Sequence, residues 1–180
     1  MGCDIHVQTY VYSKVEKKIV PVISVLEDTY LPDPIVGDRD YNLFGFFGNS
    51  FRSWYPESEV LNDGWPEFMK GTTSLAINDN EDSHTVRWVG ITELKRGIED
   101  YLERLKDSKK YIEFYNDNNS FVQDIKSGDS SEEEWEQAHE AMISSLKNLQ
   151  KNVLEYEENI ACYDEYLDRN QIYFVTWMDN

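Results

Sequence analysis

The residues best suited to chemistry in this chain form two Asp-x-His pairs, Asp4 with His6 and Asp82 with His84. In a β-strand, residues i and i+2 point to the same side, so each pair would present a carboxylate and an imidazole together. Two carboxylates and two imidazoles form a ligand set that zinc or manganese accepts. A metal-dependent hydrolase with such a divalent cofactor is therefore one hypothesis. In the alternative, Asp4 only orients His6 through a hydrogen bond.

A second group with binding chemistry lies in residues 41–88, where ten aromatic residues are interleaved with a few basic ones. Aromatic planes beside guanidinium groups are what a flat, anionic ligand such as a nucleotide requires. A core role is the alternative for these aromatics, since large rings dominate burial. The predicted ligand-binding residues are Asp4, His6, Arg39, Tyr41, Arg52, Trp54, Arg87 and Trp88, with Asp4 and His6 at the pocket floor.

The charge balance limits the possible partners. The formal net charge is −18, with 35 acidic residues against 17 basic ones, so the chain should avoid nucleic-acid backbones and anionic membranes. Acidic residues concentrate in 132–168, where Lys147 and Lys151 are the only basic residues. A charge run of this kind usually forms a solvated helix surface. The alternative is an acidic nucleic-acid mimic or an inhibitor that binds another protein.

The elements that would position these residues indicate an α+β fold. Alternating and apolar runs predict strands over 3–13, 19–26 and 171–178, the last one returning beside the first. The aromatic run 40–51 predicts a short helix, and 52–90 is rich in loop-forming residues. Apolar steps of three and four predict two antiparallel helices over 91–115 and 131–170, with a break at 116–130. The chain therefore reads as a single domain, in which 1–90 and 171–180 form a small, mostly antiparallel sheet and 91–170 form an acidic helical hairpin appended to it.

Several segments carry a resemblance to a known family. The opening hexapeptide MGCDIH resembles the start of a family of small, mostly uncharacterised proteins of tailed bacteriophages. Residues 38–44, 82–94 and 177–180 are similar to later segments of that family. The resemblance implies a phage source and action in the host cytoplasm, where small accessory phage proteins often sequester a ligand or bind a host protein. It implies no particular reaction.

These observations favour a non-enzymatic, counter-defence protein that binds a small anionic, nucleotide-like ligand without a cofactor. We expect no membrane association, because no apolar run approaches the ~18 residues of a bilayer-spanning helix. Direct nucleic-acid binding is not expected either. A homo-oligomer joined through the helical hairpin is a further hypothesis.

Overall fold

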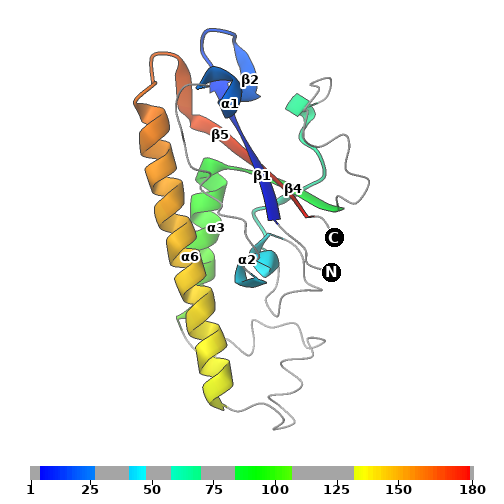
Figure 1. Ribbon diagram of the computed structural model, residues 1–180, viewed down its shortest axis with the longest axis vertical. Helices are drawn as coiled ribbons and strands as arrows, with labels where there is room; N and C mark the ends of the chain where they lie inside the picture. Colours follow the sequence, from blue (N-terminus) through cyan, green and yellow to red (C-terminus); the bar gives the residue numbers. More distant parts are fainter. Residues whose placement is uncertain (1–4, 27–40, 48–57, 70–83, 107–131, 179–180) are drawn as a thin grey trace.

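The fold is α+β, an antiparallel sheet with helices against one face (Figure 1). The computed structural model describes residues 5–26, 41–47, 58–69, 84–106 and 132–178. Its strands are β1 (Ile5–Ser13), β2 (Lys18–Pro21), β3 (Asn62–Asp63), β4 (His84–Gly90) and β5 (Leu167–Met178). Its helices are α1 (Val22–Val25), α2 (Tyr41–Phe46), α3 (Ile91–Leu105), α6 (Glu132–Ala161) and the 3-10 turn η1 (Glu67–Met69).

The five strands follow the order β2-β1-β5-β4-β3, so the last strand of the chain is the central one. β1 runs antiparallel to β5 from the pair Ile5–Met178 to the pair Ser13–Leu167. The prediction that the final strand returns beside the first is confirmed. β1 is also an interior strand, since β2 pairs along its other edge.

Side chains along β5 alternate between two faces of the sheet, as strand geometry requires. One face, with Ile172 and Phe174, joins the main core. The other, with Val175 and Trp177, forms a second cluster with Tyr10 of β1. We call this second side the aromatic face. Within the described residues, the segment 64–69 packs over it through Phe68 and Met69.

The long helices α3 and α6 lie side by side in opposite directions (Figure 1). Near one end Lys95 pairs with Glu157, and near the other the backbone of Leu105 forms a hydrogen bond with His139. Apolar residues at steps of three and four are buried along both helices, which pack against β5 and share one core with the sheet. They include Leu94, Ile98, Tyr101 and Leu105 of α3 and Met142, Leu146, Leu149, Val153, Tyr156 and Ile160 of α6.

Some boundaries differ from the sequence-based expectation. The strand predicted over 19–26 ends at Pro21, which has no amide hydrogen for the ladder, and a short helix follows. The second long helix was predicted to continue to 170, but it ends at Ala161. After Ala161 the chain forms a turn that is hydrogen-bonded to the β1–β2 hairpin. In this contact the Lys14 amide donates to the Tyr166 carbonyl at 2.8 Å.

Strand β4 was not predicted, since it falls in the loop-rich stretch 52–90. It is held by pairing with β5, which is distant in sequence. The predicted break between the long helices, at 116–130, lies outside the described residues. Within the described part of the chain, no helix has the length and apolar character needed to cross a membrane.

Candidate functional site

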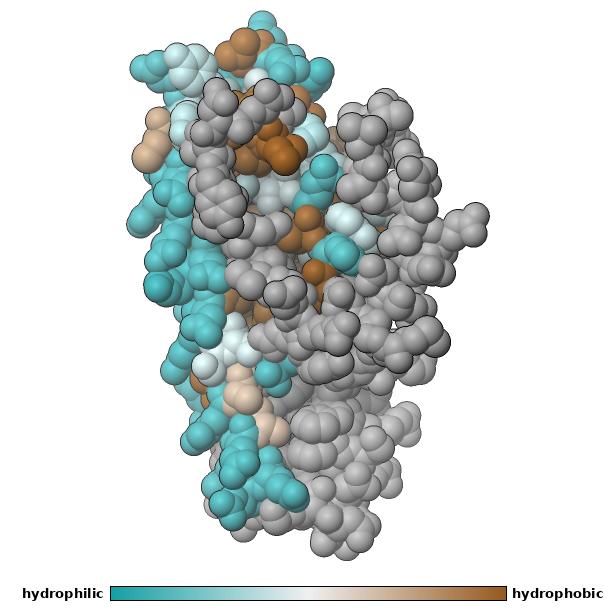
Figure 2. Space-filling view, viewed as in Figure 1, coloured by the Kyte–Doolittle hydropathy of each residue, from teal (hydrophilic) through white to brown (hydrophobic). Residues whose placement is uncertain are grey.

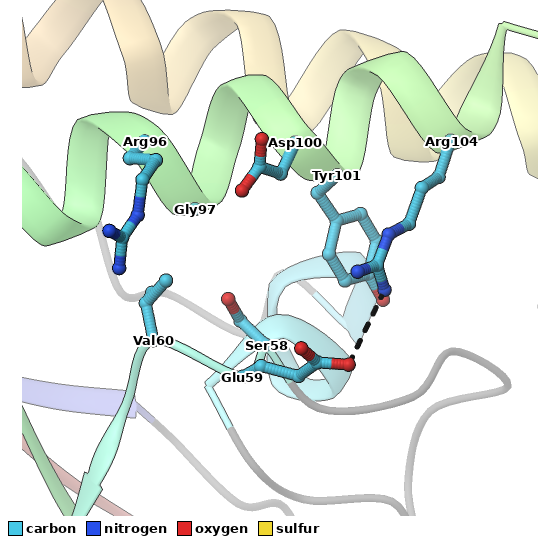
Figure 3. Close-up of a pocket in the computed structure, with 8 residues that line it drawn as sticks. All are labelled: Ser58, Glu59, Val60, Arg96, Gly97, Asp100, Tyr101 and Arg104. Atoms are coloured by element: carbon cyan, nitrogen blue, oxygen red, sulfur yellow. Dashed lines mark ion pairs between the residues drawn. The ribbon is translucent and has the colours of Figure 1, made fainter.

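A pocket of about 340 Å³ opens between α3 and the segment 58–60 (Figure 3). One wall is a single helix face, and the other is the irregular chain that follows residue 57. The lining residues are Ser58, Glu59, Val60, Arg96, Gly97, Asp100, Tyr101 and Arg104.

The charged wall of the pocket follows from helix geometry. Arg96, Asp100 and Arg104 are four residues apart, which places them on one side of α3. At 1.5 Å rise per residue, the two arginines lie roughly 12 Å apart along the axis, with Asp100 midway. Figure 3 shows all three side chains reaching from the helix toward the segment 58–60.

Gly97 lets the two walls approach. A Cβ at this position would lie 2.4 Å from Cγ2 of Val60 and 3.1 Å from Oγ of Ser58, so any larger residue would force the segment outward. Ser58 is itself buried, and its amide donates to the carbonyl of Phe46 at 3.2 Å. The pocket floor is therefore a close helix–segment contact anchored to α2.

Tyr101 supports the same floor from below. The residue is 3% exposed, and its ring packs edge-on against Phe46, with ring centroids 5.4 Å apart at an interplanar angle of 66°. Because α2 and α3 both pack against α6, the pocket is built on elements that belong to the main core.

The pocket balances two arginines against two acids, on a protein whose formal net charge is −18. Arg104 approaches Glu59 at 3.7 Å between Nη1 and Oε1, and both side chains are exposed, so this pair is weak. Among the residues that the structure describes, the side chains of Arg96 and Asp100 form no ion pair. Arg96 is thus a positive group available to an incoming anion.

Two of the residues predicted to bind ligand, Arg87 and Trp88, lie next to each other in β4. Arg87 pairs across the sheet with Asp63 of β3, at 2.7 Å between Nη1 and Oδ1. Trp88 packs on the aromatic face, its ring 6.2 Å from Phe68 and 6.4 Å from Tyr173. Neighbouring residues of a strand face opposite sides, so these two do not line one surface.

His6 also lies on the aromatic face. Its ring stacks on Trp177, with centroids 5.4 Å apart at 17°, and the exposed Trp65 lies 6.5 Å beyond Trp177. On the same face, burial raises the pKa of Tyr173, and the nearby charges of Glu93 and Asp168 raise it further. Trp88 thus takes part in ring packing, the alternative role considered for the aromatic residues of 41–88, and His6 stacks on the same face.

The other predicted site residues are described partly or not at all. Asp4, Arg39, Arg52, Trp54 and Asp82 lie outside the described residues, and only the backbones of Tyr41 and His84 are described. His84 is opposite Met178 and His6 is opposite Trp177.

The strands that carry the two histidines therefore flank β5, about two strand spacings or roughly 10 Å apart. No cluster of three or more metal-ligating side chains occurs within the described ranges. The four-residue metal site predicted from the sequence stays a hypothesis.

The acidic surface of α6 is solvent-facing along its length, and Figure 2 shows hydrophilic residues along this edge of the molecule. Glu157 differs from the others because it is partly buried and pairs with Lys95. The exposed glutamates of this helix in the described residues are Glu133, Glu134, Glu136, Glu140, Glu155 and Glu158.

The sequence-based reasoning did not select Arg96, Asp100 or Arg104. Their spacing was a usable signal, because charged residues at i, i+4 and i+8 mark one exposed helix face. The spacing alone does not show that the segment 58–60 lies opposite this helix face, because only folding brings the two together. A scan against protein-family models, a search of curated proteins and a search of solved structures each returned no match.

Proposed function

We propose that this protein is a non-catalytic binding protein for a small anionic ligand, and that the pocket between α3 and residues 58–60 is its site. The observation that carries the proposal is Arg96, which faces the pocket without an ion-pair partner in the described part of the chain. A guanidinium binds carboxylate or phosphate through two parallel hydrogen bonds, which favours such anions.

The size and charge of the pocket favour a small molecule over a polymer. A volume of about 340 Å³ lies at the lower end of the range typical of ligand sites. A nucleic acid would instead meet a strongly negative protein surface. A small anion needs only the local field of Arg96 and Arg104.

Binding without reaction fits the side chains that line the pocket. None of the eight lining residues is a histidine, the side chain that most often acts as a general acid or base near neutral pH. Ser58 therefore lacks, among these residues, the partner that usually activates a serine nucleophile. The resemblance to tailed-phage proteins extends the proposal to a biological role. The protein would act in the host cytoplasm and sequester a small anionic signal of the host defence.

The proposal is tested by titrating the full-length protein with pyrophosphate in a calorimeter. Arg96→Gln should weaken binding by about tenfold or more, because a hydrogen bond to a charged group contributes roughly 1.5–3 kcal/mol. The matched control is Arg169→Gln, which changes an exposed arginine of β5 outside the pocket. Equal affinities for the wild type and Arg96→Gln, or no binding to either, would remove the site from consideration.

A further inference from the structure

We infer that the ligand of this pocket carries a vicinal diol beside its anionic group, so that Arg96 binds the anion and Asp100 binds the diol. This inference rests on the proposed function, since it concerns the same pocket. The chemical class is that of phosphorylated sugars and ribonucleotides.

Asp100 is the feature that a simple anion site would lack. It lies one helical turn from each arginine and points into the hollow between them (Figure 3). An ionised carboxylate only accepts hydrogen bonds, and it repels a second anion. The ligand must therefore place hydrogen-bond donors, not negative charge, against the middle of the pocket.

The donors at Asp100 are best supplied by neutral hydroxyl groups. An ammonium group at this position would lie between Arg96 and Arg104, and both of these positive charges would repel it. Two adjacent hydroxyls carry no charge and match the two oxygens of one carboxylate. An acidic side chain that accepts from a ribose hydroxyl is an established pairing in nucleotide-binding folds.

Ser58 supplies a further partner on the opposite wall. The residue is 8% exposed, and Figure 3 shows its hydroxyl directed into the hollow beneath the helix. A serine hydroxyl both donates and accepts, so it suits a ligand hydroxyl better than a bare anion. The centre of the pocket is polar on both walls.

The anionic group belongs at the Arg96 end, because Arg104 is already close to Glu59. From Arg96 to Asp100 is one turn, or about 6 Å along the helix axis. This length is comparable with the span between the 5-phosphate of a ribose and its 2,3-diol. The guanidinium of Arg96 and the carboxylate of Asp100 therefore follow one another along α3 as the phosphate and the diol do in a ribose 5-phosphate unit.

The test compares ribose 5-phosphate, 2-deoxyribose 5-phosphate and inorganic phosphate on the full-length protein by ligand-observed NMR titration. We expect ribose 5-phosphate to bind several-fold more tightly than its deoxy analogue. Asp100→Asn should act in opposite directions on two ligands. It should weaken binding of ribose 5-phosphate, because a charged acceptor is lost, and strengthen binding of inorganic phosphate, because a repelling charge is lost.

Two variants complete the design. Arg96→Gln should weaken all three ligands, and Glu99→Gln, which changes the neighbouring exposed acid of α3, should weaken none. Near-ultraviolet circular dichroism verifies that each variant is folded.

Equal binding of the two sugars, both dependent on Arg96, would overturn the diol assignment and leave the anion site standing. The diol assignment would also be overturned if the sugars bind but neither Arg96→Gln nor Asp100→Asn changes their affinity. If no ligand binds, including pyrophosphate, both the diol assignment and the proposed function fail.

Discussion

Lys95 and Glu157 join α3, the helix that carries the pocket, to α6, the longest helix in the described part of the chain. Nζ of Lys95 lies 2.7 Å from Oε2 and 2.9 Å from Oε1 of Glu157, and the two side chains are 29% and 21% exposed. Lys95 adjoins Arg96, so the pair fixes α3 at the position where the pocket begins.

Breaking this pair should destabilise the fold more than breaking an exposed one. Glu157→Gln leaves a partly buried ammonium group without its carboxylate, and we expect a loss of about 1–2 kcal/mol, reduced from the fully buried case by solvent screening. Urea unfolding gives the value. The control is Glu155→Gln, which breaks the exposed i,i+4 pair with Lys151 and should cost no more than ~0.5 kcal/mol. Equal losses would mean that the Lys95–Glu157 pair has no special role.

Replacing Gly97 should push residues 58–60 away from α3, distort the pocket and strain the fold. The Cβ of an alanine would clash with Val60, and overpacking of this kind costs about 1–3 kcal/mol. Alanine also favours helix by up to ~1 kcal/mol, so we expect a net loss of stability together with weaker pyrophosphate binding.

Gly90→Ala is the matched comparison for Gly97→Ala. Its Cβ would meet the end of the flexible Glu93 side chain at 2.6 Å, which can turn away at small cost. Thermal unfolding and calorimetry of both variants would show whether Gly97 is required. A Gly97→Ala protein with wild-type melting temperature and affinity would contradict the close contact.

His139 should make stability depend on pH in mildly acidic solution. Burial lowers its pKa in the folded protein from 6.5, and the Leu105 hydrogen bond and the charge of Glu140 oppose this only in part. A histidine with a lowered folded pKa binds protons more readily when unfolded, so stability is complete above pH 6.5 and falls as the pH decreases below it.

The measurement is the free energy of unfolding between pH 8 and pH 5 for the wild type and His139→Gln. Glutamine keeps a hydrogen-bond donor and does not titrate, so the variant should lose part of the decline below pH 6.5. Parallel curves for the two proteins would exclude His139 as a source of the pH dependence.

Chelation separates the binding proposal from the metal hypothesis. We expect EDTA treatment to leave both the melting temperature and the pyrophosphate affinity unchanged, because under the proposed function the Arg96 guanidinium binds the anion without a metal ion. Elemental analysis of the wild type and His6→Ala tests the alternative. Stoichiometric zinc or manganese that disappears in His6→Ala would support the site formed by Asp4, His6, Asp82 and His84.

Local patterns determined the elements whose residues repeat with a regular period. Alternation in β1 and apolar steps of three and four in α3 and α6 are properties of neighbouring residues, so the sequence alone predicted these elements. The pairing of the terminal strands was also predictable, since β1 and β5 are both apolar runs near the chain ends.

Contacts between distant residues decided the rest. The apolar pattern of α6 continues past Ala161, but bonds from Lys14 to the turn at 164–166 end the helix there. In the sequence, Gly97 is only a residue of low helix propensity, and its role appears in the structure, where Val60 packs against it. Arg96 and Asp100 likewise belong to an ordinary exposed helix face in the sequence, and only the structure shows that Ser58 lies opposite them across the pocket. The pocket exists only after folding, because its walls are far apart in the chain and no local period records which segments will meet.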